Sequence, residues 1–366
     1  MPEPLDDRDD LDLRRPVRRT FIAALVAMVA TAATAVALVP RRGRSRGSAA
    51  TLPTGVSIPA VTEPVAVPDG VDLDPSTPFI TPNDEFFLID TAWSVPDIDV
   101  ATWRLDINGM VERPLTLSYD DLLARPMVER LITIGCVSNE VGGDYIGTAR
   151  WTGVLLRDLL DEVGIADGAE QVFSTSEDGW TCGFPVEDAL DGRDALVAVA
   201  MNGEPLPPAH GFPVRLVVPG LFGYVSATKW LRRITLTTWA DQGYWIPRGW
   251  ARDAPVKTQS RSGAPPAGAT LEPGPVTSAG GAGAMQRGID AVEVRVDGGD
   301  WQAAALGAEP TADAWRQWAL DWTATAGEHV IEVRATDGFG DVQTDERRPV
   351  DPDGATGHHT VRIVVD

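Results

Sequence analysis

The chain has 366 residues, of which 43% are hydrophobic and 23% charged, so it is long enough for two domains and a substantial core. Its formal net charge of −22 argues against a nucleic-acid-binding protein, because a phosphate-binding surface needs clustered lysine and arginine. The acidic residues are spread along the sequence, which favours solubility and indicates no particular partner.

The N-terminal residues predict export. An uncharged, alanine-rich run over residues 20–39 could just span a membrane, and arginines precede it. Arg18-Arg19-Thr20-Phe21-Ile22 has the twin-arginine form of a bacterial export signal. We therefore interpret residues 1–40 as a twin-arginine signal or membrane anchor, which places the rest of the chain outside the cytoplasm. A plain signal-anchor helix is the alternative.

Residues 41–82 are rich in Pro, Gly, Ser and Thr and have no apolar period, which predicts a flexible linker. The next region, 83–253, mixes short β-type runs with a helical stretch, so we expect an α+β domain. Its helix is predicted from apolar residues at helical spacing over 155–163. Its strands are predicted at Trp103–Ile107, Arg130–Ile134, Leu196–Ala200, Val214–Val218 and Ile234–Thr237.

The last region, 254–366, begins with a stretch over 260–284 dominated by Gly, Ala and Pro, where no periodic pattern predicts a regular element. Short alternating strands separated by turn residues follow, which indicates a small β-sandwich. These strands are predicted at Ala291–Val296, Gln317–Trp322, His329–Ala335 and Thr360–Val365.

The two cysteines, Cys136 and Cys182, could form one disulfide in an exported protein. Their surroundings differ, however, because Cys136 follows a β-type run and precedes a polar, glycine-rich loop that would present its thiol to a ligand. A thiolate binds soft metals, but one cysteine cannot hold zinc or an iron–sulfur cluster alone. Any metal at Cys136 must therefore bring ligands of its own.

A second stretch, residues 201–230, delivers basic and hydroxyl side chains within a short span that includes a turn, a strand and a glycine-bearing loop. Arginine and lysine beside small hydroxyl groups and free backbone N–H groups are suited to a phosphate. The alternative is a hairpin whose basic residues only face water. The side chains concerned are His210, Arg215, Ser226 and Lys229.

From Asn83 to the C-terminus the chain resembles the molybdopterin oxidoreductases of the sulfite oxidase type. The resemblance rests on Cys136 followed by a polar loop, and on several motifs in the family's order. These motifs are Glu85–Asp90, Thr148–Gly153, Met201–Leu206, His210–Arg215, Ser226–Trp230 and, in the tail, Arg295–Gly299. It implies a sulfite-oxidase-type catalytic domain over 83–253 and an Ig-like domain over 254–366, through which family members dimerise.

The resemblance also implies a cofactor and its site. Cys136 would bind the molybdenum of a molybdenum–molybdopterin cofactor and would be catalytic together with Asn139 and Arg150. The residues expected to line the pterin and its phosphate are Phe87, Ile89, Asp90, Thr175, His210, Arg215, Ser226, Thr228 and Lys229. No haem-binding segment accompanies them, so electrons would pass to an external cytochrome or quinone-linked protein.

The substrate expected from the resemblance is sulfite, which needs positive charge at the open face of the metal. Sulfite oxidases follow the ligand cysteine with Asn and two arginines, whereas Glu140 follows Asn139 here. The arginine that those enzymes carry near Ile89 is also missing. Arg150, Arg248, Arg252 and Lys257 are the basic residues that could replace it, and a sulfoxide reduced in the opposite direction stays open as the substrate.

Two interpretations from other classes remain. Cys136 could be a nucleophile with His210 as its base, because such partners need not be adjacent in sequence. Alternatively, the chain could be a tethered, non-enzymatic binding module with a Cys136–Cys182 disulfide and a β-sandwich interaction domain.

Overall fold

The computed structural model describes residues 57–73 and 77–366, which lie within one compact unit, Thr51–Asp366. The predicted signal or anchor and the first part of the predicted linker fall outside these residues. In the part of the chain that is described, no helix is long and apolar enough to cross a membrane.

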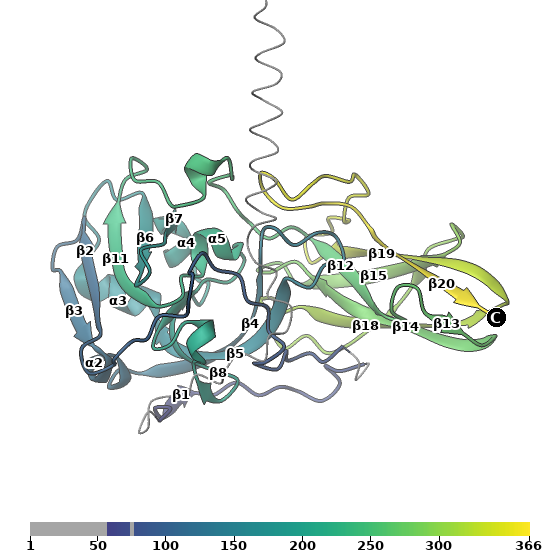
Figure 1. The fold of residues 1–366 in the computed structure, drawn as a ribbon, viewed down its shortest axis with the longest axis horizontal. Helices are drawn as coiled ribbons and strands as arrows, with labels where there is room; N and C mark the ends of the chain where they lie inside the picture. The colour runs from purple at the N-terminus through teal and green to yellow at the C-terminus, as the bar shows by residue number, and fades with distance from the viewer. Residues whose placement is uncertain (1–56, 74–76) are drawn as a thin grey trace, which may run out of the picture. The chain divides into compact units, whose positions relative to one another are not determined.

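The first half of the described chain contains two sheets (Figure 1). The first sheet runs in the order β1-β4-β5-β8-β10 with β9 beside β8. Its strands are β1 (Val61–Glu63), β4 (Met127–Gly135), β5 (Ile146–Leu155), β8 (Leu196–Met201), β9 (Glu204–Pro205) and β10 (Arg215–Val217). The second sheet runs β3-β2-β11-β6-β7. Its strands are β2 (Arg104–Gly109), β3 (Leu115–Ser118), β6 (Gln171–Ser176), β7 (Thr181–Pro185) and β11 (Leu231–Thr237).

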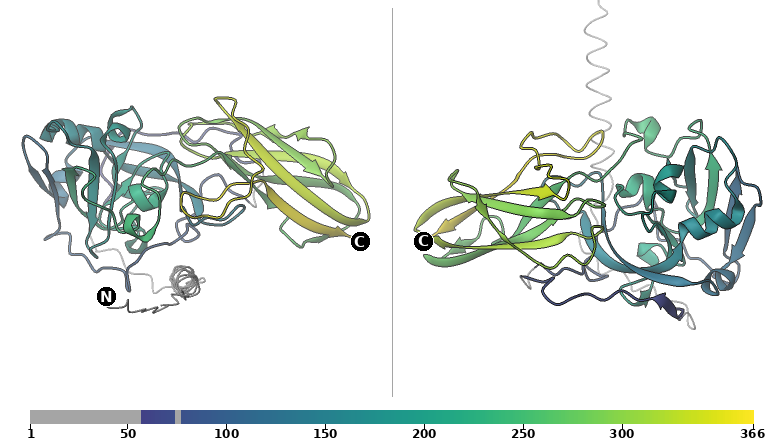
Figure 2. Two further views of the ribbon diagram at one scale, coloured as in Figure 1. Left: turned by 90° about the horizontal axis from the view of Figure 1, so that it is seen from above. Right: turned by 180° about the vertical axis from the view of Figure 1, so that it is seen from behind.

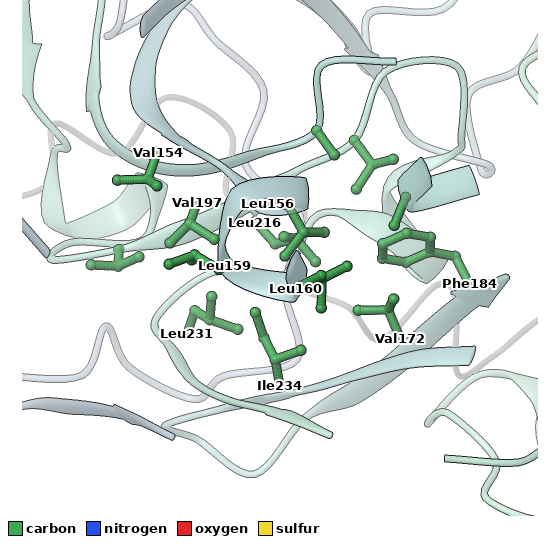
Figure 3. Packing of buried hydrophobic residues seen from close by; sticks show 14 of the residues in the cluster. Val154, Leu156, Leu159, Leu160, Val172, Phe184, Val197, Leu216, Leu231 and Ile234 are labelled. Carbon is green, nitrogen blue, oxygen red and sulfur yellow. The ribbon is translucent and has the colours of Figure 1, made fainter. Parts of the chain in front are cut away.

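Short helices accompany these sheets. They are α2 (Tyr119–Leu123), α3 (Leu156–Val163), α4 (Val186–Leu190) and α5 (Gly223–Ser226), with single 3-10 turns at η1 (Pro208–His210) and η2 (Ile246–Arg248). The expected helix is confirmed as α3, whose apolar face packs into the main core beside residues of β6 and β11 (Figure 3). The expected strands are confirmed as β2, β4, β8, β10 and β11. Because the helices are few and short, this domain is mostly β rather than an even α+β mixture.

The second half contains two further sheets, drawn in green and yellow in Figure 2, that enclose one apolar cluster. One sheet consists of β12 (Gln259–Ala264), β14 (Gly274–Gly283), β18 (Arg316–Ala324) and β17 (Ala305–Leu306). The other consists of β13 (Thr270–Leu271), β20 (His359–Val365), β19 (Gly327–Asp337), β15 (Ile289–Val296) and β16 (Gln302–Ala303). All four strands expected after residue 290 are confirmed.

The glycine- and alanine-rich stretch 260–284 is regular, contrary to expectation, since most of β12 and all of β13 and β14 lie in it. The small residues allow close approach of neighbouring groups. A side chain at Gly280 would collide with the Arg261 carbonyl of the paired strand, and the ring of Trp315 packs over Gly281. Strand pairing and packing by neighbouring side chains therefore stabilise these strands, although their sequence has no alternating apolar pattern.

The expected flexible linker is also wrong for its described part. Val61–Glu63 forms β1 and pairs in parallel with β4, while Val71 and Phe79 are buried in a small apolar cluster. These few apolar residues anchor a segment whose composition is otherwise that of a linker.

We call the two sheets of the first half the first domain and the two sheets of the second half the second domain, or sandwich. Backbone and side-chain hydrogen bonds around Thr133 of β4 fix the sandwich to the first domain. Thr133 N–H donates to the Asp313 carbonyl at 2.9 Å, and Trp315 N–H donates to Thr133 Oγ1 at 2.8 Å. The Trp315 indole N–H donates to the Phe79 carbonyl at 2.8 Å. The end of β4 and its following loop are thus held against the second domain.

Asp337, at the end of β19, binds the segment before β12 to the sandwich. Its Oδ2 accepts hydrogen bonds of 2.8 Å from both Thr258 Oγ1 and Arg287 Nε. Burial of the carboxyl group opposes its ionisation, but these hydrogen bonds outweigh that effect and lower the pKa of Asp337. Its contribution to stability is therefore present above its unfolded-state pKa of about 4 and is lost as the pH falls through the lower folded-state value.

We predict that Asp337→Asn lowers the free energy of unfolding by about 3 kcal/mol at pH 7, because it breaks a buried ion pair. Urea unfolding at pH 7 and pH 3 measures this, and the deficit shrinks at pH 3. The exposed Asp341→Asn is the matched control. A deficit of equal size at both pH values would show that the carboxylate charge is not what stabilises this junction.

Candidate cofactor and active site

Cys136 lies where the buried strand β4 changes into a loop, as predicted. Its N–H donates to the Tyr145 carbonyl at 2.9 Å, which closes the base of the loop that connects β4 to β5. The side chain is partly exposed, and Sγ lies 3.0 Å from Ser138 Oγ. Burial raises the pKa of the thiol, and the hydrogen bonds of Ser138 oppose this effect. Formation of the thiolate at Cys136 therefore needs added positive charge, such as a metal ion.

Asn139 closes the loop that begins at Cys136. Its N–H donates to the Cys136 carbonyl at 3.0 Å, and its side-chain Oδ1 accepts a 2.8 Å hydrogen bond from Tyr145 N–H. Across the loop, a side chain at Gly142 would collide with the ring of His359 from β20. The second domain therefore helps to fix the loop that carries Cys136.

Cys182 has a separate environment. Both cysteines are free, and the buried Cys182 Sγ lies 3.1 Å from Thr228 Oγ1 and 3.3 Å from Ser174 Oγ. Burial raises the pKa of Cys182 to about 11, so it remains a thiol at neutral pH. The structure thus contradicts the Cys136–Cys182 disulfide of the binding-module interpretation.

Arg215 is a buried cation in β10. Its guanidinium donates to the carbonyls of His210 at 3.1 Å and Ala227 at 3.4 Å and lies 4.9 Å from the centre of the Trp151 ring. Nε has no hydrogen-bond partner, and within residues 57–73 and 77–366 no carboxylate forms an ion pair with Arg215. Burial lowers the pKa of Arg215 to about 9, so the side chain still carries its charge at neutral pH. Such a group is suited to an anionic ligand.

Lys229 and Asp90 bring opposite charges to the same region. Lys229 Nζ lies 2.5 Å from Asp90 Oδ2 and donates to the Ala209 carbonyl at 3.0 Å. It also lies 4.6 Å from the centre of the Trp230 ring. Burial lowers the pKa of Lys229, and Asp90 opposes that shift.

His210 links these two cations to the segment before β2. Its Nε2 lies 2.8 Å from the Asn83 carbonyl, and burial together with the positive charge of Arg215 lowers the pKa of His210 to about 4. The ring is therefore neutral at pH 7, with Nε2 donating to that carbonyl. Cys136 Sγ forms its hydrogen bond with Ser138, and His210 Nε2 forms its own with Asn83, so the described residues do not show the Cys136–His210 pair of the nucleophile interpretation.

The hydroxyl groups of this region have local partners. Thr228 Oγ1 lies 2.6 Å from Ser174 Oγ, and Ser226 donates to the Phe222 carbonyl at 3.0 Å within α5. Neighbouring residues of a strand point to opposite faces, so Thr175 lies on the other face of β6 from Ser174. Thr175 stays a prediction, and its neighbour Ser174 is the residue of β6 that meets Thr228.

The segment Glu85–Asp90 forms no regular helix or strand. Phe86 and Phe87 stack with their ring centres 5.2 Å apart, and Phe86 meets the rings of Trp151 and His210 edge to face at 5.8 Å. Ile89 is half-buried in the same segment. Aromatic packing thus holds Phe86 and Phe87, and the ion pair with Lys229 fixes Asp90.

The basic residues proposed to replace the missing arginine lie in different environments. Arg248 stacks on Tyr244 at 3.6 Å and Arg252 on Trp239 at 4.6 Å. The side-chain Nε of Arg150 is buried without a hydrogen-bond partner. Lys257 lines a small hollow whose wall also contains Cys136 and Asn139.

Several residues of the site were not predicted. Asn83 and Trp151 contact His210 and Arg215, and Asp353 pairs with Lys257. Asn83 and Trp151 lie in or beside motifs quoted for the resemblance, so proximity to a motif could have identified them. Nothing in the sequence indicates Asp353, because it comes from a loop of the second domain.

Comparison with known proteins gives these residues a context. Residues 92–245 match the family model described as oxidoreductase molybdopterin binding domain. The chain is 33% identical over 321 residues to human mitochondrial sulfite oxidase, covering 74% of this chain but 58% of that protein. It is 32% identical over 323 residues to the sulfite oxidase of Gallus gallus, covering 74% of this chain and 70% of that protein.

A solved structure shares the fold over most of the chain. The sulfane dehydrogenase SoxCD from Paracoccus pantotrophus superposes with a TM-score of 0.67 at 24% identity, covering 88% of this chain and 93% of that one. Together with the similarity to the sulfite oxidases, this shows that the chain belongs to the sulfite oxidase family of molybdopterin oxidoreductases.

Proposed function

We propose that this protein binds a molybdenum–molybdopterin cofactor with Cys136 as the protein ligand to the metal, and catalyses two-electron oxygen-atom transfer. The observation that carries the proposal is Arg215, a buried guanidinium with an orphaned Nε and no carboxylate partner among the described residues. An anionic cofactor would supply the missing counter-charge.

The donor set fits such a cofactor. The described residues contain no group of three or more His, Cys, Asp and Glu side chains that could hold a metal ion. A metal that arrives with ligands of its own needs few from the protein, and one thiolate at a strand end meets that need. When bound, the molybdenum centre supplies the redox chemistry, and the protein supplies orientation and electrostatics.

We assign roles to the surrounding residues on the same basis. Arg215, Lys229 and Thr228 would face the phosphate and pterin, while His210 is held neutral and positions the segment at Asn83. Asn139 keeps the Cys136 loop closed. The unpartnered Nε of Arg150 could serve substrate or cofactor.

The leading substrate is sulfite, which would take one oxygen atom from water and release two electrons and two protons as it becomes sulfate. The names of the relatives, sulfite oxidase and sulfane dehydrogenase, support a small sulfur compound. Glu140 beside Asn139 favours a second candidate, a neutral sulfoxide that would be reduced instead, because a carboxylate repels an anion.

The electrons of sulfite oxidation would leave through an external carrier such as a cytochrome or a quinone-linked protein. The sandwich over 254–366 would be Ig-like and form a homodimer, as the resemblance implies.

We also propose that residues 1–40 direct the folded, cofactor-loaded protein through the twin-arginine route, leaving residues 20–39 as an anchor or a cleaved signal. Replacing Arg18 and Arg19 with lysine would then leave the protein in the cytoplasm, as cell fractionation would show. Export of this double variant at the wild-type level would refute the route without affecting the enzymatic proposal.

We predict that Arg215→Met reduces the molybdenum content of the purified protein at least tenfold, because the counter-charge for the cofactor is lost. The free energy of unfolding of the cofactor-free protein should change by less than about 1 kcal/mol, since removing a buried unpaired charge offsets the loss of two hydrogen bonds. Arg334→Met, at an ion pair in the sandwich, is the matched control for metal content. A fully loaded Arg215→Met protein would contradict the assignment.

We predict that Cys136→Ser abolishes molybdenum-dependent oxidation of sulfite, measured with an artificial electron acceptor, because a serine hydroxyl is not a soft thiolate ligand. Cys182→Ser, at the buried thiol, should keep its activity. If Cys136→Ser kept full molybdenum-dependent turnover, the proposed metal ligand would be wrong.

A further inference from the structure

The hollow beside Cys136 is built by both domains. Cys136 and Asn139 contribute from the loop after β4, and Phe222 closes one side. Lys257 reaches it from the segment before β12, and Ala355 from the loop between β19 and β20. A small molecule beside Cys136 would therefore contact the second domain as well as the first.

Lys257 is the only basic residue among the described residues that line this hollow. Its Nζ donates to Asp353 Oδ1 at 2.9 Å and to the Gly354 carbonyl at 2.8 Å. An ammonium group has three N–H donors, so one is left for a ligand. The side chain is 27% exposed and forms part of the wall of the hollow.

The choice of lysine at this position is unusual for this chain. Of its 31 Lys and Arg residues only two, Lys229 and Lys257, are lysines. Lys229 lies buried at the proposed cofactor site, and Lys257 lines the same hollow as Cys136. Lysine presents a compact point charge, whereas arginine presents a wide planar fork, so lysine is suited to a narrow space.

Asp353 limits the charge that a ligand would meet. Its carboxylate neutralises most of the field of Lys257 at a distance, although the ammonium group can still donate a hydrogen bond at contact. Asp353 itself does not line the hollow. The cation of the pair therefore lines the hollow, whereas its counter-ion does not.

We propose that Lys257 is the specificity-determining cation that binds an oxyanion substrate beside Cys136, and that Asp353 tunes its affinity. The inference rests on the proposed function and deepens it by naming the residue that replaces the arginines of sulfite oxidases. A purely structural Lys257 would anchor the loop that contains Asp353 and Gly354 and would not distinguish charged from neutral substrates.

The test uses the cofactor-loaded protein with sulfite as the anion and dimethyl sulfoxide as the neutral compound. We expect Lys257→Met to raise KM for sulfite about tenfold or more while kcat changes less than threefold. Lys257→Arg should recover part of the affinity, and Asp353→Asn should lower KM several-fold. Constants for dimethyl sulfoxide should not move in any variant, and Arg252→Met, stacked on Trp239 outside the hollow, is the control.

A second measurement does not need turnover. Sulfate binding, followed by calorimetry on loaded and cofactor-free protein, should weaken about tenfold in Lys257→Met and tighten in Asp353→Asn. Unchanged sulfite KM and sulfate affinity in Lys257→Met would overturn the inference, as would weaker binding in Asp353→Asn.

The failures can be told apart. Absence of molybdenum from the wild-type protein would reject the proposed function, while sulfate binding that depends on Lys257 would still support the anion site. Loaded protein that turns over sulfite equally well with and without Lys257 would reject the anion site alone.

Discussion

The burial of Arg215 without a counter-charge is the constraint on which the site depends. Its charge lies among backbone carbonyls and the Trp151 ring, and a buried ion that lacks a partner lowers stability unless a ligand compensates it. Lys229, by contrast, has Asp90. The surplus positive charge is therefore at Arg215, and burial together with that charge keeps the neighbouring His210 neutral.

The second domain helps to shape the site around Cys136. Trp315 holds the end of β4 through Thr133, and the ring of His359 restricts the loop at Gly142. Lys257 and its partner Asp353 then complete the hollow next to Cys136. The geometry around the proposed metal ligand thus depends on packing between domains, and changes far from the cofactor would alter the substrate side.

Local patterns allowed much of this to be predicted from the sequence. Helical spacing identified α3, and the position of Cys136 after a β-type run correctly placed it at a strand end. Prediction failed where stability comes from distant partners. Strand β14 is held by backbone pairing of small residues, which no local apolar pattern reveals. The pairing of Lys257 with a residue 96 positions away could not be read from any local pattern.

We propose that Arg215 and Cys136 belong to one molybdopterin site. A crystal structure of the protein purified from a host that makes the cofactor tests it most directly. We predict an anionic group of the cofactor within hydrogen-bond distance of the Arg215 guanidinium and molybdenum bound to Cys136 Sγ. A loaded protein whose metal is not bound to Cys136, or whose Arg215 meets only protein carbonyls and water, would contradict it.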